Sequence, residues 1–287
     1  MFPTILKNNT KEFIQNISIV ILHYRTPQLL KKCLFSILKF YPEIEKKILV
    51  IDNFSQDNTI QLLEKKFPEI QILASTYNSG FARGINWGLE NVKTKYVLTL
   101  NPDIIIKPGS LEKMYSFMEK QPNIVLIGPK LINPDGTIQD SCRRFMHLMM
   151  IFYRRTKLGS LPFIKQKVAD FLMKNADHQK IQPVDWIFGA AMFVRMSAIQ
   201  KVGSLDERYF MYFEDMDWCR RFWESGFKVY YFPKAEFIHY HLRMSAEKNG
   251  LSALFNKLGR IHLASALKYF WKFKCRKLPV INFKNIR

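Results

Sequence analysis

The sequence predicts an α/β fold in which a mostly parallel, Rossmann-like sheet is covered by helices on both faces. In the first half of the chain, short apolar runs alternate with segments whose apolar residues recur at helical spacing. The runs are continuously apolar, so both faces of each strand are expected to be buried, as in a parallel sheet between two helical layers. The 287 residues, 48% of them hydrophobic, are enough for one large domain of this kind.

The strands and helices follow one another from residue 17. The first strand, 17–22, is apolar and β-branched, and Thr26 and Pro27 then form the pattern of a helix N-cap with proline at the first helical position. Apolar residues at helical spacing continue this helix to Leu38. The next strands are predicted at 47–51, 70–74, 96–100 and 124–127, the next helices at 58–67, 81–92 and 110–120, and further apolar runs at 186–194 and 229–232.

The pattern divides the chain into a main domain at 17–247, a short extension at 1–16 and a basic amphipathic segment at 248–287. Within the main domain, 141–182 is basic and lacks a clear period, which indicates an insertion or a mobile loop. In 255–277, apolar and basic residues alternate at helical spacing, which predicts an interfacial helix that docks on a membrane. The alternative is that its apolar face packs on the main domain.

The formal net charge of +20 indicates an anionic partner, which could be a nucleic acid, an acidic membrane or a phosphorylated substrate. The four cysteines form no C-x-x-C pair, so reduced thiols are expected rather than disulfides or a zinc site. No run approaches about 18 apolar residues, and the N-terminus lacks the apolar region of a secretory signal. We therefore expect the protein in the cytoplasm, in solution or on a membrane surface.

Polar residues follow the predicted strands, at the edge where parallel sheets bind ligands. Tyr24, Asp52 and Asn78 come after the first three strands, and Asn101-Pro102-Asp103 comes after the fourth. The carboxylate of Asp103 could bind a divalent cation that holds a diphosphate, although Asn-Pro-Asp also forms simple turns.

A cluster of acidic residues comprises Glu214, Asp215 and Asp217. Crowded carboxylates raise one another's pKa, which suits a general base near neutral pH, but acidic residues also favour the first turn of a helix. His239 and His241 lie two residues apart, and either could be a metal ligand or a structural residue.

The loop from Asn78 leads through Gly80 into a predicted helix, where the helix N-terminus and Arg83 could hold phosphate. The loop does not have the G-x-G-x-x-G pattern, and no G-x-x-x-x-G-K-[ST] occurs. A nicotinamide-dependent dehydrogenase or a P-loop NTPase is therefore unsupported.

The order of these segments resembles the family 2 glycosyltransferases with a GT-A fold, in particular the rhamnosyltransferases of bacterial surface polysaccharides such as O-antigen. The resemblance covers roughly residues 17–245. The matching segments are SIVILHY (18–24), LVIDNFSQDNT (49–59), NSGFARGINWGL (78–89), YVLTLNPDI (96–104), GPKLINPDGTIQDSCRR (128–144), WIFGAAMFVR (186–195), VGSLDERYFMYFEDMDWCRR (202–221) and HYHLRMS (239–245).

The resemblance implies that Tyr24 and Asp52 contact the nucleotide base and ribose and that Arg83 approaches the diphosphate. Asn78 and Gly80 belong to the same predicted donor-binding set. Asn101 and Asp103 occupy the first and last positions of the family's DxD metal motif.

Asn at the first of those positions leaves fewer anionic ligands for the Mg²⁺ or Mn²⁺ that the resemblance implies. His239, or alternatively His241, would complete the metal site. Trp186 and Gly189 match the acceptor-side segment of the family. Asp215 matches the catalytic carboxylate, with Glu214 and Asp217 beside it.

The implied reaction is an inverting transfer, in which Asp215 removes a proton from an acceptor hydroxyl. The expected donor is dTDP-L-rhamnose, with a UDP-sugar such as a galactofuranose donor as the alternative. The expected acceptor is a polyprenyl-diphosphate-linked saccharide or another growing glycan, reached from an anionic inner-membrane surface.

A non-catalytic basic protein that binds membranes or nucleic acid is the main rival. It leaves unexplained the carboxylates and histidines placed after apolar strands, so nucleic acid is not expected as a partner. The sequence does not predict an oligomeric state.

Overall fold

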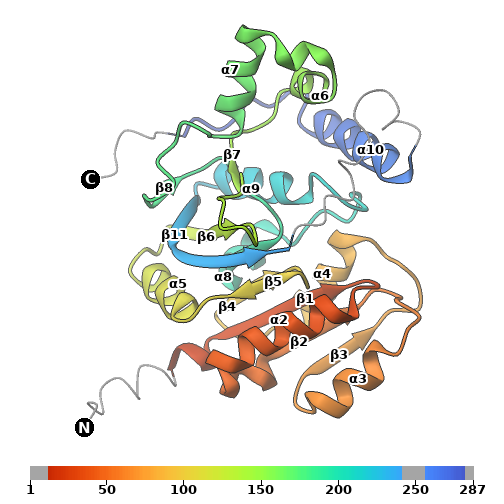
Figure 1. The fold of residues 1–287 in the computed structure, drawn as a ribbon. Helices are drawn as coiled ribbons and strands as arrows, with labels where there is room; N and C mark the ends of the chain where they lie inside the picture. The colour runs from red at the N-terminus through yellow and green to blue at the C-terminus, as the bar shows by residue number, and fades with distance from the viewer. Residues whose placement is uncertain (1–11, 241–255, 282–287) are drawn as a thin grey trace.

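The computed structural model describes residues 12–240 and 256–281 (Figure 1). In these residues a nine-stranded sheet has the order β3-β2-β1-β4-β10-β6-β11-β5, and β8 pairs with β11. A small second sheet pairs β7 with β9. The strands are β1 (Ile17–His23), β2 (Ile48–Asp52), β3 (Gln71–Ala74), β4 (Tyr96–Leu100), β5 (Ile104–Ile106), β6 (Ile124–Ile132), β7 (Cys142–Arg143), β8 (Gln182–Pro183), β9 (Trp186–Ile187), β10 (Ala191–Arg195) and β11 (Lys228–His239).

The predicted mostly parallel sheet flanked by helices is confirmed. β3, β2, β1 and β4 are parallel neighbours, and β6 is parallel to β11. The run at 186–194 does not form one strand, because the chain leaves the small sheet after Ile187 and enters the main sheet at Ala191. The resulting β10 is antiparallel to both β4 and β6 and joins the two parallel parts.

Helices cover both faces of the sheet, and each layer has its own apolar core. One core takes Leu30, Leu34 and Met114 from α2 and α5, and the other takes Ile85 and Trp218 from α4 and α9. The helices are α2 (Pro27–Phe40), α3 (Thr59–Lys66), α4 (Phe81–Glu90), α5 (Ser110–Glu119), α6 (Leu148–Arg155), α7 (Pro162–Phe171), α8 (Met196–Val202), α9 (Glu214–Glu224) and α10 (Lys257–Lys272), with 3-10 turns η1 (Pro42–Lys47) and η2 (Lys157–Ser160).

The predicted start of α2 is confirmed in position and differs in its hydrogen bonding. Thr26 is the N-cap residue and Pro27 begins the helix, but the Thr26 side chain does not cap a backbone N–H. Its hydroxyl oxygen instead lies 3.1 Å from Nδ1 of His23, at the end of β1. The threonine therefore links the helix to the strand that precedes it.

Of the two alternatives predicted for 141–182, an insertion or a mobile loop, the loop is wrong. The segment folds into α6, η2 and α7, which contact one another. Met150, Ile151 and Phe171 from these helices are buried in the same core as α4 and α9. The helical period was hidden because apolar residues also occupy the outer face of α6, as described below.

The predicted C-terminal helix is present as α10. Ala266 and Tyr269 are buried against the main domain, as the packing alternative requires. The expected domain boundary at residues 247 and 248 lies outside the described residues, between β11 and α10. Within the described part of the chain, no helix is long and apolar enough to cross a membrane.

Candidate active site

Asp103 and His239 meet at one edge of the sheet, although they are far apart in sequence. Asp103 directly precedes β5, and His239 ends β11, where it pairs with Ile104 across the two strands. Oδ1 of Asp103 lies 3.3 Å from Nε2 of His239, and the backbone carbonyl of Asp103 accepts a hydrogen bond from Tyr240. Of the two histidines predicted as ligands, His239 is at the site, and His241 lies outside the described residues.

The hydrogen bonds of Gln139 indicate which ring nitrogen of His239 carries a proton. Nε2 is the nitrogen that faces Asp103. The Gln139 amide donates to Asn133 and to the His239 carbonyl, so its Oε1 is left as the acceptor for Nδ1 of His239 at 2.7 Å. Nδ1 therefore carries a proton. A neutral imidazole would then direct its Nε2 lone pair at the Asp103 carboxylate, and two such electron-pair donors 3.3 Å apart suit a shared cation.

Asn101, the first residue of the predicted metal motif, has its backbone engaged in the fold. Its N–H donates to the Ala190 carbonyl at 2.9 Å, which ties the end of β4 to the start of β10. No group of three or more His, Cys, Asp or Glu side chains gathers at one point among residues 12–240 and 256–281. Asp103 and His239 are therefore a two-residue set.

A second buried pair lies where β1 and β2 end. Nε2 of His23 lies 3.9 Å from Oδ1 of Asp52, and within the described chain neither atom has a hydrogen-bond partner. Burial lowers the pKa of His23, so the imidazole is favoured in its neutral form. Oδ2 of Asp52 accepts a hydrogen bond from the Ser55 N–H, which leaves Oδ1 as a buried acceptor without a donor.

The loops after β1 and β2 contain backbone conformations that are unusual for residues with side chains. Arg25, Phe54 and Gln56 all have positive φ angles, of 54°, 71° and 57°. The two loops are joined because the Arg25 N–H donates to the hydroxyl of Ser55 at 2.9 Å. Such strain is maintained where the surroundings require it, often at binding sites. Tyr24 lies in the first of these loops and is exposed.

Asn53, which follows the second predicted strand together with Asp52, is a buried connecting residue for which the sequence predicted no specific role. Its Nδ2 donates to Oδ1 of Asn78 and to the Gly80 carbonyl, and its Oδ1 accepts from the backbone and hydroxyl of Ser79. The sequence signal was its position beside Asp52 at the end of a buried strand. Asn53 therefore holds the predicted donor-binding loop against the end of β2.

Gly80 is required for packing between two loops. Its φ is +84°, and a Cβ built on it would lie 2.4 Å from the Phe210 carbonyl oxygen. The next residue, Phe81, donates its N–H to the same oxygen. The N-terminal end of α4 is thus occupied in part by the loop at residue 210.

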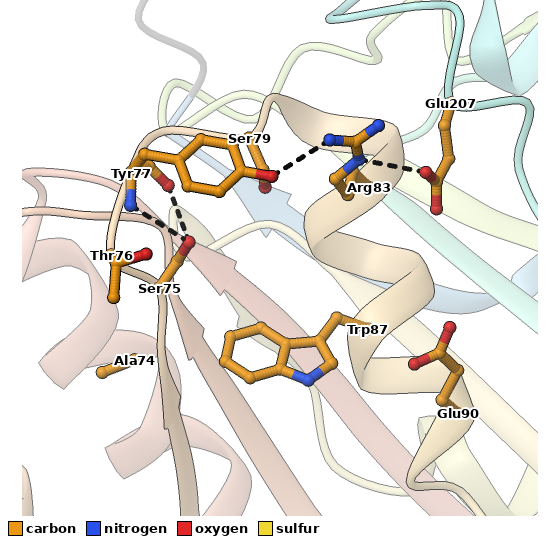
Figure 2. Close-up of a pocket in the computed structure, with 9 residues that line it drawn as sticks. All are labelled: Ala74, Ser75, Thr76, Tyr77, Ser79, Arg83, Trp87, Glu90 and Glu207. Carbon is orange, nitrogen blue, oxygen red and sulfur yellow. Dashed lines mark hydrogen bonds and ion pairs between the residues drawn. The ribbon is translucent and has the colours of Figure 1, made fainter.

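Arg83 lines a cavity of about 460 Å³ between the end of β3 and α4 (Figure 2). Its guanidinium forms an ion pair with Glu207 at 3.0 Å and donates to the hydroxyl of Tyr77 at 3.0 Å. Neither Asp52 nor Asp103 lines this cavity. The predicted contact of Arg83 with the diphosphate is therefore not evident from this cavity, whose lining places Arg83 with Glu207 and Tyr77.

Asp215 is buried at the start of α9 and faces Gly189. Its Oδ2 accepts the Gly189 N–H at 2.9 Å, and its Oδ1 accepts the Met216 N–H at 2.8 Å. A Cβ on Gly189 would lie 3.4 Å from Oδ2 of Asp215, in ordinary van der Waals contact with the carboxylate. Burial raises the pKa of Asp215, and the two N–H donors together with the charge of Arg143 oppose that rise.

The two other carboxyl groups of the cluster have different surroundings. Oε2 of Glu214 is buried and has no hydrogen-bond partner among the described residues. Burial and the charge of Asp215 hold the pKa of Glu214 well above its usual range, which favours the protonated form of Glu214. Asp217 is fully buried and bonded to Arg221, Lys272 and Tyr209.

The expected acceptor-side residues lie close to Asp215. Trp186 is buried, and its indole N–H donates to the Arg144 carbonyl at 2.7 Å. The guanidinium of Arg143 lies 5.1 Å from the Trp186 ring and 5.5 Å from the Phe188 ring. We had assigned no role to Arg143, although it lies in a segment used for the resemblance.

The backbone before α9 is strained. Tyr212 and Phe213 both have φ of 71°, and Phe213 is the N-cap residue of the helix. The three acidic residues occupy the first turn of α9, where they also favour the helix dipole. The structural and the chemical interpretations of this cluster are therefore compatible.

Comparison with known proteins identifies relatives over most of the chain. A family model described as glycosyl transferase family 2 matches residues 18–182. An N-acetylglucosaminyl-diphospho-decaprenol L-rhamnosyltransferase of Mycobacterium tuberculosis is 28% identical over 244 residues, covering 80% of this chain and 78% of that protein. The rhamnosyltransferase WbbL of Escherichia coli K12 is 29% identical over 204 residues, covering 66% of this chain and 69% of that protein.

Solved structures share the fold at low sequence identity. GalNAc-T7 with UDP, GalNAc and Mn²⁺ has a TM-score of 0.59 at 13% identity, over 78% of this chain and 44% of that one. S. aureus TarS has a TM-score of 0.55 at 14% identity, over 78% of this chain and 36% of that one. The chain thus spans less than half the length of these two structures. The match of the family model to more than half of its residues shows that the chain is a glycosyltransferase enzyme and belongs to glycosyl transferase family 2.

Proposed function

We propose that this glycosyltransferase moves L-rhamnose from dTDP-L-rhamnose to a hydroxyl of a polyprenyl-diphosphate-linked saccharide, with inversion at the anomeric carbon. The observation that carries the chemical part is the placement of Asp215, whose two oxygens each accept one backbone N–H. The names of the two rhamnosyltransferase relatives support the sugar and, for one of them, the lipid-linked acceptor.

In the proposed reaction, Asp215 acts as the general base. A free lone pair on its carboxylate accepts the proton of the acceptor hydroxyl while the hydroxyl oxygen bonds to the anomeric carbon. The bond from that carbon to the diphosphate oxygen breaks, and the nucleoside diphosphate leaves with both electrons. General-base assistance of this kind typically contributes about 10²–10⁴ in rate.

Protonated Glu214 supports this role for Asp215. Two ionised carboxylates in one buried site would repel each other, so retention of the proton by Glu214 favours ionised Asp215 at neutral pH. The positive charge of Arg143 also opposes the rise in the pKa of Asp215 and so favours its ionised form.

Asp103 and His239 would hold a divalent cation, Mg²⁺ or Mn²⁺. A carboxylate oxygen and an imidazole nitrogen 3.3 Å apart fit such an ion, because both atoms donate electron pairs and both can coordinate one cation that lies between them. When bound, the cation would offset the negative charge of the leaving diphosphate. Phosphate oxygens and water would complete the coordination, since the two-residue set leaves positions open.

Asp52 and Tyr24 would bind the nucleoside. The unpartnered Oδ1 of Asp52 is an acceptor suited to a ribose hydroxyl or a base N–H, and a buried acceptor gains most from such a donor. Tyr24 offers an exposed ring in the adjoining loop. A UDP-sugar remains the second candidate donor, because UDP is bound in GalNAc-T7 and in a complex of S. aureus TarS.

The test is donor hydrolysis and calorimetric binding with the full chain and Mg²⁺. The panel would contain dTDP-L-rhamnose, UDP-glucose, UDP-N-acetylglucosamine and UDP-galactofuranose. We expect the tightest binding and fastest hydrolysis with dTDP-L-rhamnose, and loss of both on addition of EDTA or in Asp103→Ala. A clear preference for a UDP-sugar would contradict the proposed donor, and unchanged activity in EDTA would contradict the cation.

A further inference from the structure

The α6–η2–α7 segment presents large apolar side chains to solvent. Phe163 is 71% exposed and Phe152 is 51% exposed. The other exposed apolar residues of the segment are Leu148, Met149, Leu158 and Leu161. Scattered exposed apolar residues are common on proteins, but six within sixteen consecutive positions are a concentrated patch.

The exposed and buried residues of α6 lie on opposite sides of the helix. Met150 and Ile151 pack into the core that α4 and α9 share, while Leu148, Met149 and Phe152 point outward. The outward residues are therefore additional to the apolar residues that anchor the helix. Packing among the described residues does not account for them.

The charge of the segment is of one sign. Residues 148–167 contain Arg154, Arg155, Lys157, Lys165 and Lys167 and no Asp or Glu. The side chain of Lys167 lies over the ring of Phe163, with its Nζ 4.3 Å from the ring centre, so a cation accompanies the most exposed aromatic. Apolar aromatic residues combined with basic ones suit the boundary between the acyl chains and anionic headgroups of a bilayer.

The position of the segment links it to the site. It begins five residues after Arg143, whose guanidinium packs on Trp186 and whose charge acts on Asp215. Phe145, between Arg143 and α6, donates its N–H to Asp185 at 2.6 Å, which ties the base of the segment to the residue before β9. An acceptor held at a membrane by a lipid would approach from this side.

We propose that the outer face of α6, η2 and the N-terminal end of α7 docks on an anionic lipid bilayer. This inference rests on the proposed lipid-linked acceptor for its purpose, but not for its physical basis. It replaces α10 as the membrane contact. Lys268 and Lys272 of α10 are bonded to the Arg208 carbonyl and to Asp206 and Asp217, so these two lysines act within the protein.

The experiment compares the segment with α10, which carries two equally exposed apolar residues, Leu267 and Trp271. The full chain, Phe152→Ser/Phe163→Ser and the control Leu267→Ser/Trp271→Ser would be co-sedimented with vesicles of phosphatidylglycerol or of phosphatidylcholine. Thermal unfolding and donor hydrolysis in solution would check that each variant is folded. None of these four residues belongs to the proposed catalytic or binding machinery.

We expect the full chain and the α10 control to bind phosphatidylglycerol vesicles at low salt and to bind phosphatidylcholine weakly. The segment variant should lose at least about tenfold in partitioning, because two inserted aromatic rings are removed. Equal binding of all three proteins, loss only in the α10 control, or no binding of the full chain would each overturn the proposal. A dimer in sedimentation velocity that only the segment variant abolishes would assign the patch to a second copy instead. Hydrolysis without vesicle binding would overturn docking alone and leave the proposed reaction intact.

Discussion

The two faces of α9 use the same kind of side chain for different purposes. On the face toward Gly189, Asp215 is held by backbone N–H groups, and no cationic side chain of residues 12–240 or 256–281 bonds to it directly. On the face toward α10, Asp217 is enclosed by Arg221 and Lys272 and accepts a third bond from Tyr209. Whether a buried carboxylate can accept a proton therefore depends on its bonded partners and not on its place in an acidic motif.

The largest effect on stability is expected for Asp217→Asn. The amide would leave Arg221 and Lys272 without their shared counter-charge, and breaking one partner of a buried ion pair typically costs about 3–5 kcal/mol. Urea unfolding measures the free energy. The control is Asp177→Asn, whose exposed pair with Lys180 should change stability by less than about 1 kcal/mol. Equal effects would show that the buried ion pairs of Asp217 contribute no more to the free energy of unfolding than an exposed pair does. That result would contradict the structural role of the α9 face toward α10.

A smaller effect is expected for Gly189→Ala, on turnover. The new methyl would lie in van der Waals contact with the Asp215 carboxylate, 3.4 Å from Oδ2, and would take space that an acceptor hydroxyl or water needs beside that oxygen. We expect the rate of donor hydrolysis to fall about tenfold, equivalent to about 1.4 kcal/mol, with the thermal midpoint nearly unchanged. A fall in stability without a fall in rate would show that this contact serves folding, as on the opposite face.

The smallest effect is expected for Glu214→Gln, which keeps the neutral state of the buried side chain. Turnover at pH 7 should change by less than about threefold, far below the 10²–10⁴ of general-base catalysis. A larger loss would move the base from Asp215 to Glu214.

The stability of the same variant should depend less on pH. The native state of the unmodified protein holds the Glu214 proton at pH values where the unfolded chain has released it, so stability falls as pH rises above the unfolded pKa. Glutamine removes this proton from the balance. Between pH 5 and pH 8 the variant should lose less stability than the unmodified protein in thermal unfolding.

The sequence predicted the parallel half of the fold well, because β1, β2 and β3 are each followed by a helix of regular period. β4 is followed first by the short strand β5, which the sequence did not predict. It did not predict β10 as an antiparallel insertion, since strand direction depends on where the chain turns after Ile187. The helices α6 and α7 were missed because their outer faces are apolar as well. Both errors concern the neighbours that a segment meets in the folded protein, and the local sequence pattern does not specify those neighbours.

In the candidate site, too, the sequence predicted individual residues better than contacts between distant segments. Asp103 and His239 were predicted together, and the structure places them 3.3 Å apart. Residues 215 and 217 are about 200° apart around a helix, so the sequence could have separated Asp215 from Asp217. It could not have named Lys272, which lies 55 positions away in the chain and bonds to Asp217. Asn53 and Arg143 were likewise hidden, because their roles depend on contacts between loops.

The proposed role of Asp215 as the general base is tested most directly by one paired measurement. Asp215→Asn would be compared with the unmodified chain in donor hydrolysis and in calorimetric binding of the preferred sugar nucleotide. We predict that hydrolysis falls by about 10²–10⁴, as expected when a general base is removed, while donor affinity changes by less than about threefold. Retention of more than about a tenth of the hydrolysis rate, with the protein folded and the donor bound, would contradict the assignment of Asp215 as the base.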